Sequence, residues 1–370
     1  MKISNILINS PHRQGRLRMV FECFRTPICA AFATLAFLSF AHGTARADDS
    51  LSLVLGRTPE LMNTLNLTAQ GAGFYKEEHL RVTVSRVKSS LDAQQACSSG
   101  QFDICPIGIE PLITNYDKGV RLKMFLTRAA KFTYVYAVLD DSPIRSLADL
   151  KGKNIGVHSS DGASATAATE SGLKVAGVEP YEYKLVTIGK DNDAIEALVS
   201  GKVDAAALPY YEFIPYIIAG RKLRIFPHPA LENVTNSGYA ISPAVLATKG
   251  GPVKRFSRAI VKSALLIRYN PQAAGRAILI ALDKPFNDAD LNRKTAELIA
   301  WEAYLPAGDP DSNRIGALGP EGIQDYIELM KSAAVVANPP PATALVTNEF
   351  VGPANDFDHA AFEKYAKSLP

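Results

Sequence analysis

Apolar residues in the segment 192–212, NDAIEALVSGKVDAAALPYYE, recur at spacings of three and four, which predicts a helix with one apolar face. Gly201 supplies the left-handed residue that commonly ends a helix. Residues 203–208 then form an apolar run without the alternation of a one-sided sheet, so we expect a buried strand. Pro209 ends this strand, and two tyrosines and a glutamate follow it.

The same pattern occurs earlier in the chain, in residues 91–110. Both copies read D-A-x-x-A-x-x-S-G-x-x-D and precede an apolar strand, and the last aspartate is Asp103 in one copy and Asp204 in the other. A repeat of this length indicates two similar α/β units, in which we expect the two aspartates to fix turns. Because ligands of open α/β sheets bind beyond the carboxyl ends of the strands, residues 107–110 and 208–212 are predicted to face one ligand site.

Alternating or continuous apolar runs predict the other strands, at 51–55, 80–87, 122–126, 133–139, 154–158, 183–188, 222–226 and 238–247. Helical spacing predicts helices at 60–73, 112–120, 147–150, 164–176 and 213–219, and, in the last third of the chain, at 252–269, 273–282, 288–304, 321–335 and 357–367. Alternating strand and helix units followed by helices indicate an α/β fold with a C-terminal helical cover.

The composition, 47% hydrophobic and 21% charged, is that of a globular protein long enough for two domains. The net charge of +3 is concentrated in residues 1–47, which hold six Lys and Arg residues and one acidic residue. The remainder is slightly acidic, so no basic face indicates nucleic-acid binding.

Residues 1–47 also have the order of a secretory signal peptide: a basic region, an apolar run at 28–41 and an A-x-A sequence ending at Ala47. The run is shorter than the roughly 20 residues of a membrane span. We therefore expect cleavage after Ala47 and a soluble periplasmic protein. An uncleaved anchor is the alternative, and Met19 is an alternative start that leaves a shorter basic region.

Cys97 and Cys105 are the two cysteines that this cleavage leaves. Export would permit a disulfide between them, but the helix-to-strand turn that separates them works against the required Cα approach. Two buried thiols are the favoured interpretation, and the disulfide stays open. Without histidines at ligand spacing the cysteines do not indicate a zinc site, and we predict neither a metal nor a cofactor.

Residues 159–164, SSDGAS, join a predicted strand to a predicted helix start. Hydroxyls and free backbone N–H groups at such a place form an anion-binding corner, and simple helix capping is the alternative. Asp161 would weaken anion binding if it faced the ligand. The candidate ligand-binding residues of this loop are Ser159, Ser160, Gly162 and Ser164.

Tyr210 and Tyr211 follow the end of a predicted strand, where aromatic rings can enclose a ligand and donate a phenol hydrogen bond; packing between lobes is the alternative. Glu110 and Glu212 also lie past strand ends and could receive a ligand amino group or cap the next helix. Arg57, after the first strand, could be the counter-ion of a carboxylate or sulfonate, or a solvated surface residue.

The chain contains no G-x-S-x-G, P-loop or H-E-x-x-H sequence, and its histidines are scattered. The sequence therefore gives no catalytic signature, and we predict a protein that is not an enzyme.

Three segments carry a resemblance to a known family: S-L-A-D-L-K-G-K-N-I-G-V at 146–157, A-L-V-S-G-K-V-D-A at 197–205 and G-F-Y-K-E-E-H-L-R-V at 73–82. Together they resemble the periplasmic solute-binding proteins of ABC importers, of the nitrate, sulfonate and taurine or thiamine-pyrimidine-precursor binding type. The resemblance covers roughly residues 51–270. Family members usually have Gly-Leu where this chain has His79-Leu80.

The resemblance implies a type II periplasmic-binding fold, an α/β architecture of two lobes joined by two crossing strands, with C-terminal helices. It places lobe 1 at 48–138 plus 238–370 and lobe 2 at 139–237. It also implies a monomer with a small-molecule ligand in the interlobe cleft and an ABC permease as membrane partner. The ligand-binding residues that it implies are Arg57, Thr58, Gly108, Glu110, Ser159, Ser160, Gly162, Ser164, Tyr210, Tyr211 and Glu212.

The predicted function is capture, without catalysis, of a small organic solute for import: a sulfonate, a carboxylate or a pyrimidine-like heterocycle. An anion would use Ser160, Ser164 and Arg57, and a flat heterocycle would use Tyr210 and Tyr211. One alternative is a pyrimidine-synthase-like enzyme of the same fold, although this chain lacks the cysteine-rich iron motif of those relatives. Another is a ligand-sensing partner of a membrane receptor.

Overall fold

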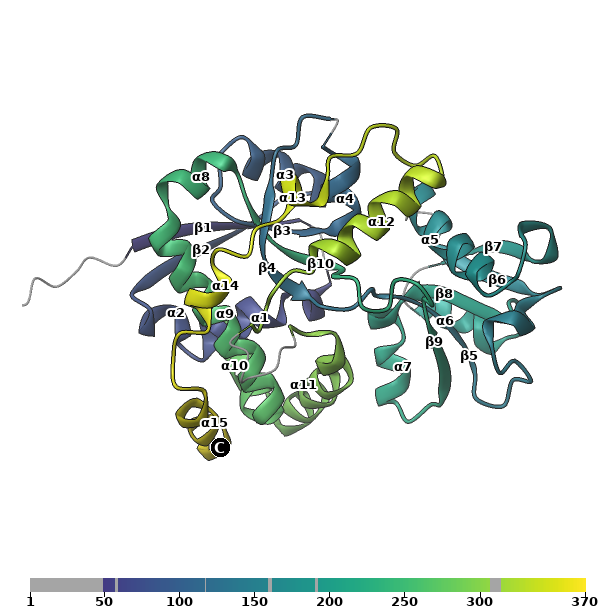
Figure 1. Cartoon of the computed structure of the whole chain (residues 1–370). Helices are drawn as coiled ribbons and strands as arrows, with labels where there is room; N and C mark the ends of the chain where they lie inside the picture. The colour runs from purple at the N-terminus through teal and green to yellow at the C-terminus, as the bar shows by residue number, and fades with distance from the viewer. Residues whose placement is uncertain (1–48, 57–58, 117, 159–161, 190–191, 307–313) are drawn as a thin grey trace, which may run out of the picture. The chain divides into compact units, whose positions relative to one another are not determined.

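The computed structural model of the chain describes residues 49–370 apart from 57–58, 117, 159–161, 190–191 and 307–313 (Figure 1). The predicted signal peptide and its cleavage after Ala47 lie outside the described residues. So do four candidate ligand-binding residues, which are Arg57, Thr58, Ser159 and Ser160.

Five strands form what we call the first sheet. Strand β1 (Asp49–Leu55) pairs in parallel with β2 (Leu80–Arg86). A single parallel bridge from Leu53 to Ile104 joins this pair to a three-stranded part with the order β3-β10-β4. The strands of that part are β3 (Cys105–Gly108), β10 (Ser237–Ile241) and β4 (Lys123–Ala129), and β10 is antiparallel to both neighbours.

The second sheet has the order β7-β6-β8-β5-β9. Strand β6 (Asn154–His158) is parallel to β7 (Lys184–Ile188) and to β8 (Ala205–Pro209). Strand β5 (Tyr134–Leu139) is antiparallel to β8 and to β9 (Leu223–Pro227). Both sheets therefore have three parallel strands followed by one reversed strand and an edge strand.

The chain crosses between the sheets twice, because each reversed strand follows directly on a strand of the other sheet. Strand β5 follows β4 across residues 130–133, and β10 follows β9 across residues 228–236. These two crossings and the two α/β sheets confirm the predicted fold class.

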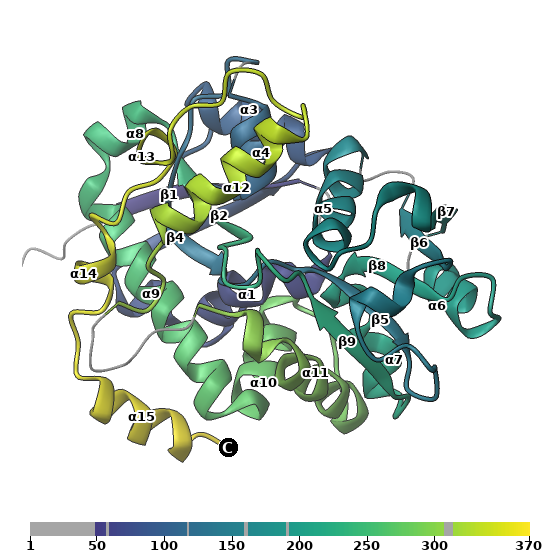
Figure 2. The same ribbon diagram turned by 45° about the vertical axis from the view of Figure 1, so that its right-hand side comes forward.

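Helices cover both faces of the first sheet. In Figures 1 and 2, α3 (Ser90–Ser98), α4 (Ile109–Thr114) and α12 (Pro320–Ser332) lie on one face, and α1 (Thr64–Gly71) and α9 (Gly250–Tyr269) lie on the other. The remaining helices are α2 (Phe74–Glu77), α5 (Gly162–Val175), α6 (Asn192–Val199), α7 (Ile214–Ile218), α8 (Pro243–Thr248), α10 (Pro271–Ala281), α11 (Asp288–Trp301), α13 (Ala342–Leu345), α14 (Val351–Ala354) and α15 (His359–Ser368).

Short 3-10 helices occur at η1 (Glu60–Asn63), η2 (Leu147–Leu150), η3 (Pro180–Glu182), η4 (Tyr210–Glu212) and η5 (Glu302–Tyr304). The core of the first sheet centres on Phe256 of α9, which is fully buried. Its ring contacts Tyr239 at 5.2 Å and Tyr75 at 5.7 Å between centroids. Around this aromatic contact, α9 buries mainly aliphatic and small side chains such as Ile260 and Leu265.

The two copies of the sequence repeat fold into equivalent elements. Helices α3 and α6 end at Gly100 and Gly201, whose φ angles of 79° and 75° lie in the left-handed region that favours glycine. The Asp103 carboxylate accepts hydrogen bonds from the Ser52 backbone N–H at 2.8 Å and from the Ser52 hydroxyl at 2.9 Å. The Asp204 carboxylate accepts one from the Asn154 N–H at 2.8 Å. Each aspartate thus ties the third parallel strand of its sheet to the first.

Two predicted elements are wrong. The strand predicted at 238–247 ends at Ile241, because Ser242 accepts a hydrogen bond from the Val245 N–H at 3.3 Å and Pro243 occupies the first turn of α8. The helix predicted at 112–120 begins and ends earlier, as α4 over Ile109–Thr114. Its start follows directly on β3, so no loop separates them.

Cys97 and Cys105 are separate, buried thiols, so the disulfide alternative is not formed in the structure. Burial raises the pKa of the Cys105 thiol well above its usual value. Both residues pack in the core between α3 and β3 as small apolar side chains.

The imidazole of His228 anchors the second crossing. Its Nδ1 accepts hydrogen bonds from the backbone N–H groups of Ala230 (3.2 Å) and Leu231 (3.1 Å). Its Nε2 lies 3.1 Å from the Ala168 carbonyl oxygen, which requires the proton to be on Nε2. Because burial opposes the charged form, the pKa of His228 falls to about 4.

The Asp103→Ala variant should unfold more easily than Asp204→Ala. Asp103 is buried and also forms an ion pair with Lys249 at 2.7 Å, whereas Asp204 is exposed. We expect losses of about 3 kcal/mol and about 1 kcal/mol in the free energy of unfolding, measured with urea. Equal losses would show that burial does not separate the two copies.

His228 should make the protein less stable as the pH falls from about 6.5 to about 4. The unfolded imidazole has a pKa near 6.5, and the folded one has a pKa of about 4, so the unfolded state binds more protons in this window. The stability advantage of the wild type over His228→Asn should therefore shrink on acidification, by up to about 3 kcal/mol. Urea unfolding of both proteins at pH 7 and pH 4.5 measures this difference, and a gap independent of pH contradicts the assignment.

Candidate functional site

A cavity of about 390 Å³ lies where the two copies of the repeat end, and we call it the Arg128 cavity. Gly108, the last residue of β3, and Glu110 contribute to it from the first sheet, and Pro209, the last residue of β8, and Tyr211 contribute from the second. The structure thus brings together the two strand ends that the sequence predicts to face one site. The complete lining is Pro59, Met62, Ser90, Gly108, Ile109, Glu110, Pro111, Arg128, Phe132, Thr133, Tyr134, Ala168, Pro209, Tyr211, Asn236, Ser237 and Tyr326.

Residues of the two crossings line this cavity, and hydrogen bonds join one crossing to the other. The Asn236 side-chain oxygen accepts from the Thr133 N–H at 3.3 Å and from the Thr133 hydroxyl at 3.1 Å. The Asn236 carbonyl accepts from the Ile109 N–H at 2.8 Å, and the Thr133 carbonyl accepts from the Tyr210 N–H at 2.7 Å. One residue pair therefore connects the strand-end loops of both sheets.

Arg128, the penultimate residue of β4, brings a buried positive charge to the wall. The residue is 6% exposed. Its Nε donates to the Ser237 hydroxyl at 3.4 Å, and its Nη1 has no hydrogen-bond partner among the described residues. The side chains that act on it electrostatically are the neutral Tyr239, Tyr211 and Cys105, and burial lowers the pKa of Arg128. Among the described residues this guanidinium has no carboxylate partner of the kind that usually offsets the desolvation of a buried cation.

Aromatic rings form another part of the wall. Phe132 contacts Tyr326 edge-on at 5.5 Å and Tyr134 at 5.9 Å between centroids. Burial, and secondarily the charge of Glu110, raise the pKa of Tyr326, so its phenol stays protonated and can donate a hydrogen bond. The cavity therefore combines the Arg128 cation, the Glu110 carboxylate and flat aromatic surfaces.

Tyr210 and Tyr211 have different surroundings. Tyr210 stacks on Tyr304 at 4.6 Å, and Tyr304 stacks on Trp301 at 5.0 Å, so the Tyr210 ring belongs to an aromatic stack and is not part of the cavity lining. Tyr211 contacts Trp301 edge-on at 6.2 Å and lines the Arg128 cavity. Of the two tyrosines, Tyr211 is thus the one that a ligand in this cavity would meet.

A second cavity, of about 650 Å³, lies beyond Tyr211, and we call it the Lys294 cavity. It contains Glu212, which the sequence places beside the ligand. Its lining is Pro59, Glu60, Leu61, Ile195, Glu196, Val199, Tyr211, Glu212, Ile214, Pro215, Tyr216, Ala219, Arg221, Arg293, Lys294 and Glu297.

The serine-rich loop gives less information. Ser159 and Ser160 lie outside the described residues, while Gly162 and Ser164 belong to the first turn of α5. Ala168, one turn further along α5, lines the Arg128 cavity. The start of this helix is therefore near the cavity, and a ligand contact of its serines stays a prediction.

Arg128 is the residue that the sequence interpretation missed. It stands in the apolar strand KMFLTRA, just before a crossing, and a lone arginine in such a run is the signal that could have found it. The sequence interpretation instead assigned the counter-ion role to Arg57, which is outside the described residues.

The described part of the chain contains no group of three or more His, Cys, Asp or Glu residues that could hold a metal ion. Among the same residues, no helix has both the length and the apolar character of a membrane span.

The comparisons with known proteins agree with this architecture. The family model described as NMT1/THI5 like matches residues 63–274. The riboflavin-binding protein RibY of Chloroflexus aurantiacus is 23% identical over 309 residues, which cover 81% of this chain and 86% of RibY.

Among solved structures, the periplasmic aliphatic sulphonate binding protein SsuA of Escherichia coli superposes with a TM-score of 0.62 at 16% identity, over 81% of this chain and 92% of SsuA. The desulfurization enzyme DSZB superposes with a TM-score of 0.52 at 17% identity, over 83% of this chain and 98% of DSZB. These matches confirm the type II periplasmic-binding fold and the predicted resemblance to periplasmic solute-binding proteins.

Replacing Arg128 should stabilise the protein in the absence of ligand. Arg128→Met keeps the length of the side chain and removes a buried charge that has no carboxylate partner in the part of the chain that the structure describes. We therefore expect the free energy of unfolding to rise by about 1–3 kcal/mol. Urea unfolding measures it, with Arg81→Met, an exposed strand position, as the control that should change little. A clear loss of stability in Arg128→Met would mean that the guanidinium is structural.

Proposed function

The chain belongs to the NMT1/THI5-like family, and from this premise we propose that it is the extracytoplasmic substrate-binding component of an ABC importer. It captures a small organic anion in the Arg128 cavity and delivers it to a membrane permease. The observation that carries the proposal is the buried guanidinium of Arg128, which lies without a carboxylate partner among the described residues, on a cavity built from the ends of both sheets.

The energetics of Arg128 favour a ligand with a negative charge. Burying a cation without a partner costs several kcal/mol, and an anion that enters the cavity offsets this cost. Sulfonates and carboxylates match the planar fork of a guanidinium. The ligand thereby gains contacts that the free protein lacks, which is the condition for ligand-driven stabilisation of one conformation.

The aromatic wall favours an organic body on this anion. Phe132, Tyr134 and Tyr326 present flat surfaces of the kind that ring-bearing ligands use. The names of two relatives fit parts of this chemistry: the ligand named for SsuA is an aliphatic sulphonate, which is an organic anion, and the ligand named for RibY is riboflavin, which has a flat ring system without a charge. We propose an organic sulfonate or carboxylate as the solute, with a pyrimidine-like heterocycle as a possible part of its body.

The cellular setting belongs to the same proposal. Residues 1–47 would direct export and be removed after Ala47, and the mature chain would work as a periplasmic monomer. The two lobes would be 48–138 with 238–370 and 139–237. The two crossings near 130–133 and 228–236 would be the connections about which they move.

An enzyme of the same fold is the second candidate, and the likeness to the desulfurization enzyme DSZB is the observation that favours it. Its weakness is the chemistry of the thiols. Cys97 and Cys105 are both buried, and burial raises the pKa of Cys105, which makes thiolate attack on a substrate unfavourable. Product formation from a sulfinate or sulfonate by the purified chain would support this candidate.

Binding of organic anions tests the main proposal. The purified mature chain is titrated calorimetrically with sulfonates, carboxylates, pyrimidines and flavins, and thermal unfolding is followed in parallel. We expect an organic sulfonate or carboxylate to raise the melting temperature, and Arg128→Met to weaken its binding at least about 30-fold.

Arg81→Met serves again as the matched control and should bind like the wild type. No binding of any anion at millimolar concentration would contradict the proposal. Binding that survives Arg128→Met would remove Arg128 as the anchor.

A further inference from the structure

We infer that the Arg128 cavity and the Lys294 cavity form one bipartite site for an elongated amphipathic anion. The anionic group binds at Arg128, and the body of the molecule extends past Tyr211 into the Lys294 cavity. This inference rests on the proposed function and names the class of solute.

The two cavities share a wall. Pro59 and Tyr211 line both of them, so the same two side chains face the ligand from either side. The Tyr211 ring is held edge-on against Trp301 at 6.2 Å. A fixed aromatic ring that lines both cavities gives the middle of a long ligand an apolar surface to pack against.

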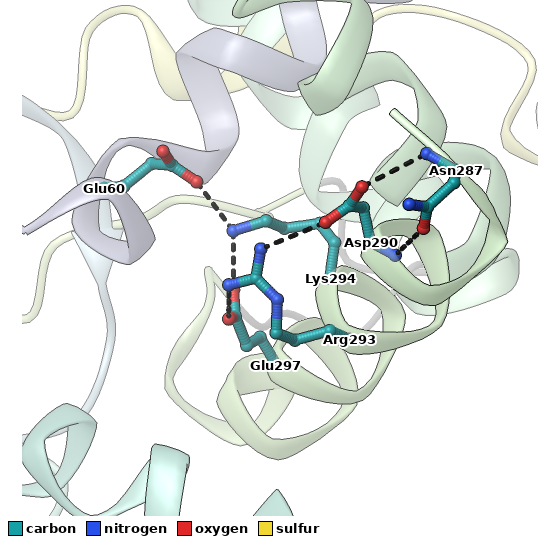
Figure 3. A network of polar contacts seen from close by, with 6 residues as sticks. All are labelled: Glu60, Asn287, Asp290, Arg293, Lys294 and Glu297. Carbon is teal, nitrogen blue, oxygen red and sulfur yellow. Dashed lines mark hydrogen bonds and ion pairs between the residues drawn. The ribbon is translucent and has the colours of Figure 1, made fainter. Parts of the chain in front are cut away.

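The Lys294 cavity offers little attraction for a second anionic group, because its buried cation is already neutralised and its lining holds more carboxylates than cations. The carboxylates are those of Glu60, Glu196, Glu212 and Glu297, and the cations are Arg221, Arg293 and Lys294. Lys294, whose side chain is 5% exposed, lies between Glu60 at 2.6 Å and Glu297 at 2.5 Å (Figure 3). In the same network Arg293 lies 3.5 Å from Glu297 and 3.7 Å from Asp290. The charged end of the ligand therefore belongs at Arg128.

Beside the charged side chains of Glu196, Glu212 and Arg221, the Lys294 cavity has an apolar wall that fits the body of a ligand. Leu61, Ile195, Val199 and Ile214 contribute aliphatic surface, and Tyr216 contributes a ring. Its volume of about 650 Å³ exceeds the 390 Å³ of the Arg128 cavity, so a molecule of a few atoms would leave most of the space unused. Ligand sites usually have several polar groups that orient the ligand and a larger apolar part that binds its bulk.

A series of sulfonates of increasing length tests the inference. Ethanesulfonate, butanesulfonate, hexanesulfonate and octanesulfonate are titrated calorimetrically into the wild-type mature chain. We expect the affinity to rise about fourfold for each methylene that enters the Lys294 cavity. Octyltrimethylammonium, a cation with the same tail, should not bind, which separates the site from unspecific adsorption.

Variants on the surface separate the two cavities. Val199→Asp puts a charge on the wall of the Lys294 cavity, and Val175→Asp puts one at an exposed position of α5 that lines neither cavity; the two valines are 41% and 58% exposed. We expect Val199→Asp to lower the octanesulfonate affinity at least tenfold more than the ethanesulfonate affinity, and Val175→Asp to change neither.

The outcomes distinguish this inference from the proposed function. If all four sulfonates bind with equal affinity and lose it in Arg128→Met, the bipartite site is refuted while the function stands. Equal losses for short and long sulfonates in Val199→Asp refute it too. If no sulfonate binds the wild type, the bipartite site for sulfonates is refuted, while the proposed function is refuted only if the carboxylates also fail to bind.

Discussion

The hydrogen bonds between Thr133 and Asn236 are the constraint on which the rest of the site depends. They join the two crossings, and the carbonyls of the same residues accept from Ile109 and Tyr210, the first residues beyond β3 and β8. The ends of β3 and β8 are thereby both fixed to the pair of crossings. Because the polar groups of Thr133 and Asn236 form these hydrogen bonds within the protein, the cavity walls keep their geometry. By contrast, Nη1 of Arg128 has no hydrogen-bond partner among the described residues.

The site combines this order with an unfavourable charge. A guanidinium 6% exposed, with neutral phenols and a thiol around it, is costly to the free protein. The surrounding fold has enough buried apolar surface to tolerate that cost, with Phe256 and the sheet beneath α9 at its centre. Under the proposed function, the stability given up at Arg128 would be recovered as binding free energy when an anion binds, which is a usual relation between strain and function.

Local pattern was sufficient to predict most of the elements, because helix spacing, glycine at φ > 0 and apolar runs act over a few residues. The repeat therefore located Gly108, Glu110 and Tyr211 beside one cavity. It could not reveal Arg128, whose burial comes from β10 pairing with β4 from far along the chain. The sequence could not show that the Tyr210 ring lies in an aromatic stack, because its partner Tyr304 follows α11, far along the chain. The strand predicted at 238–247 was too long, because Ser242 caps a helix whose first turn contains Pro243.

The exchange of strands between the sheets also determines when each can form. Strand β10 fills the gap between β3 and β4, yet the ribosome makes it only after the whole of the second sheet. The first half of a nascent chain consequently exposes unpaired edges of β3 and β4 until the later segment arrives. Such long-range pairing slows folding and leaves the incomplete sheet open to association with other chains. Slow closure would also keep the polypeptide extended for longer, the state in which a chain can be threaded through a narrow translocation pore.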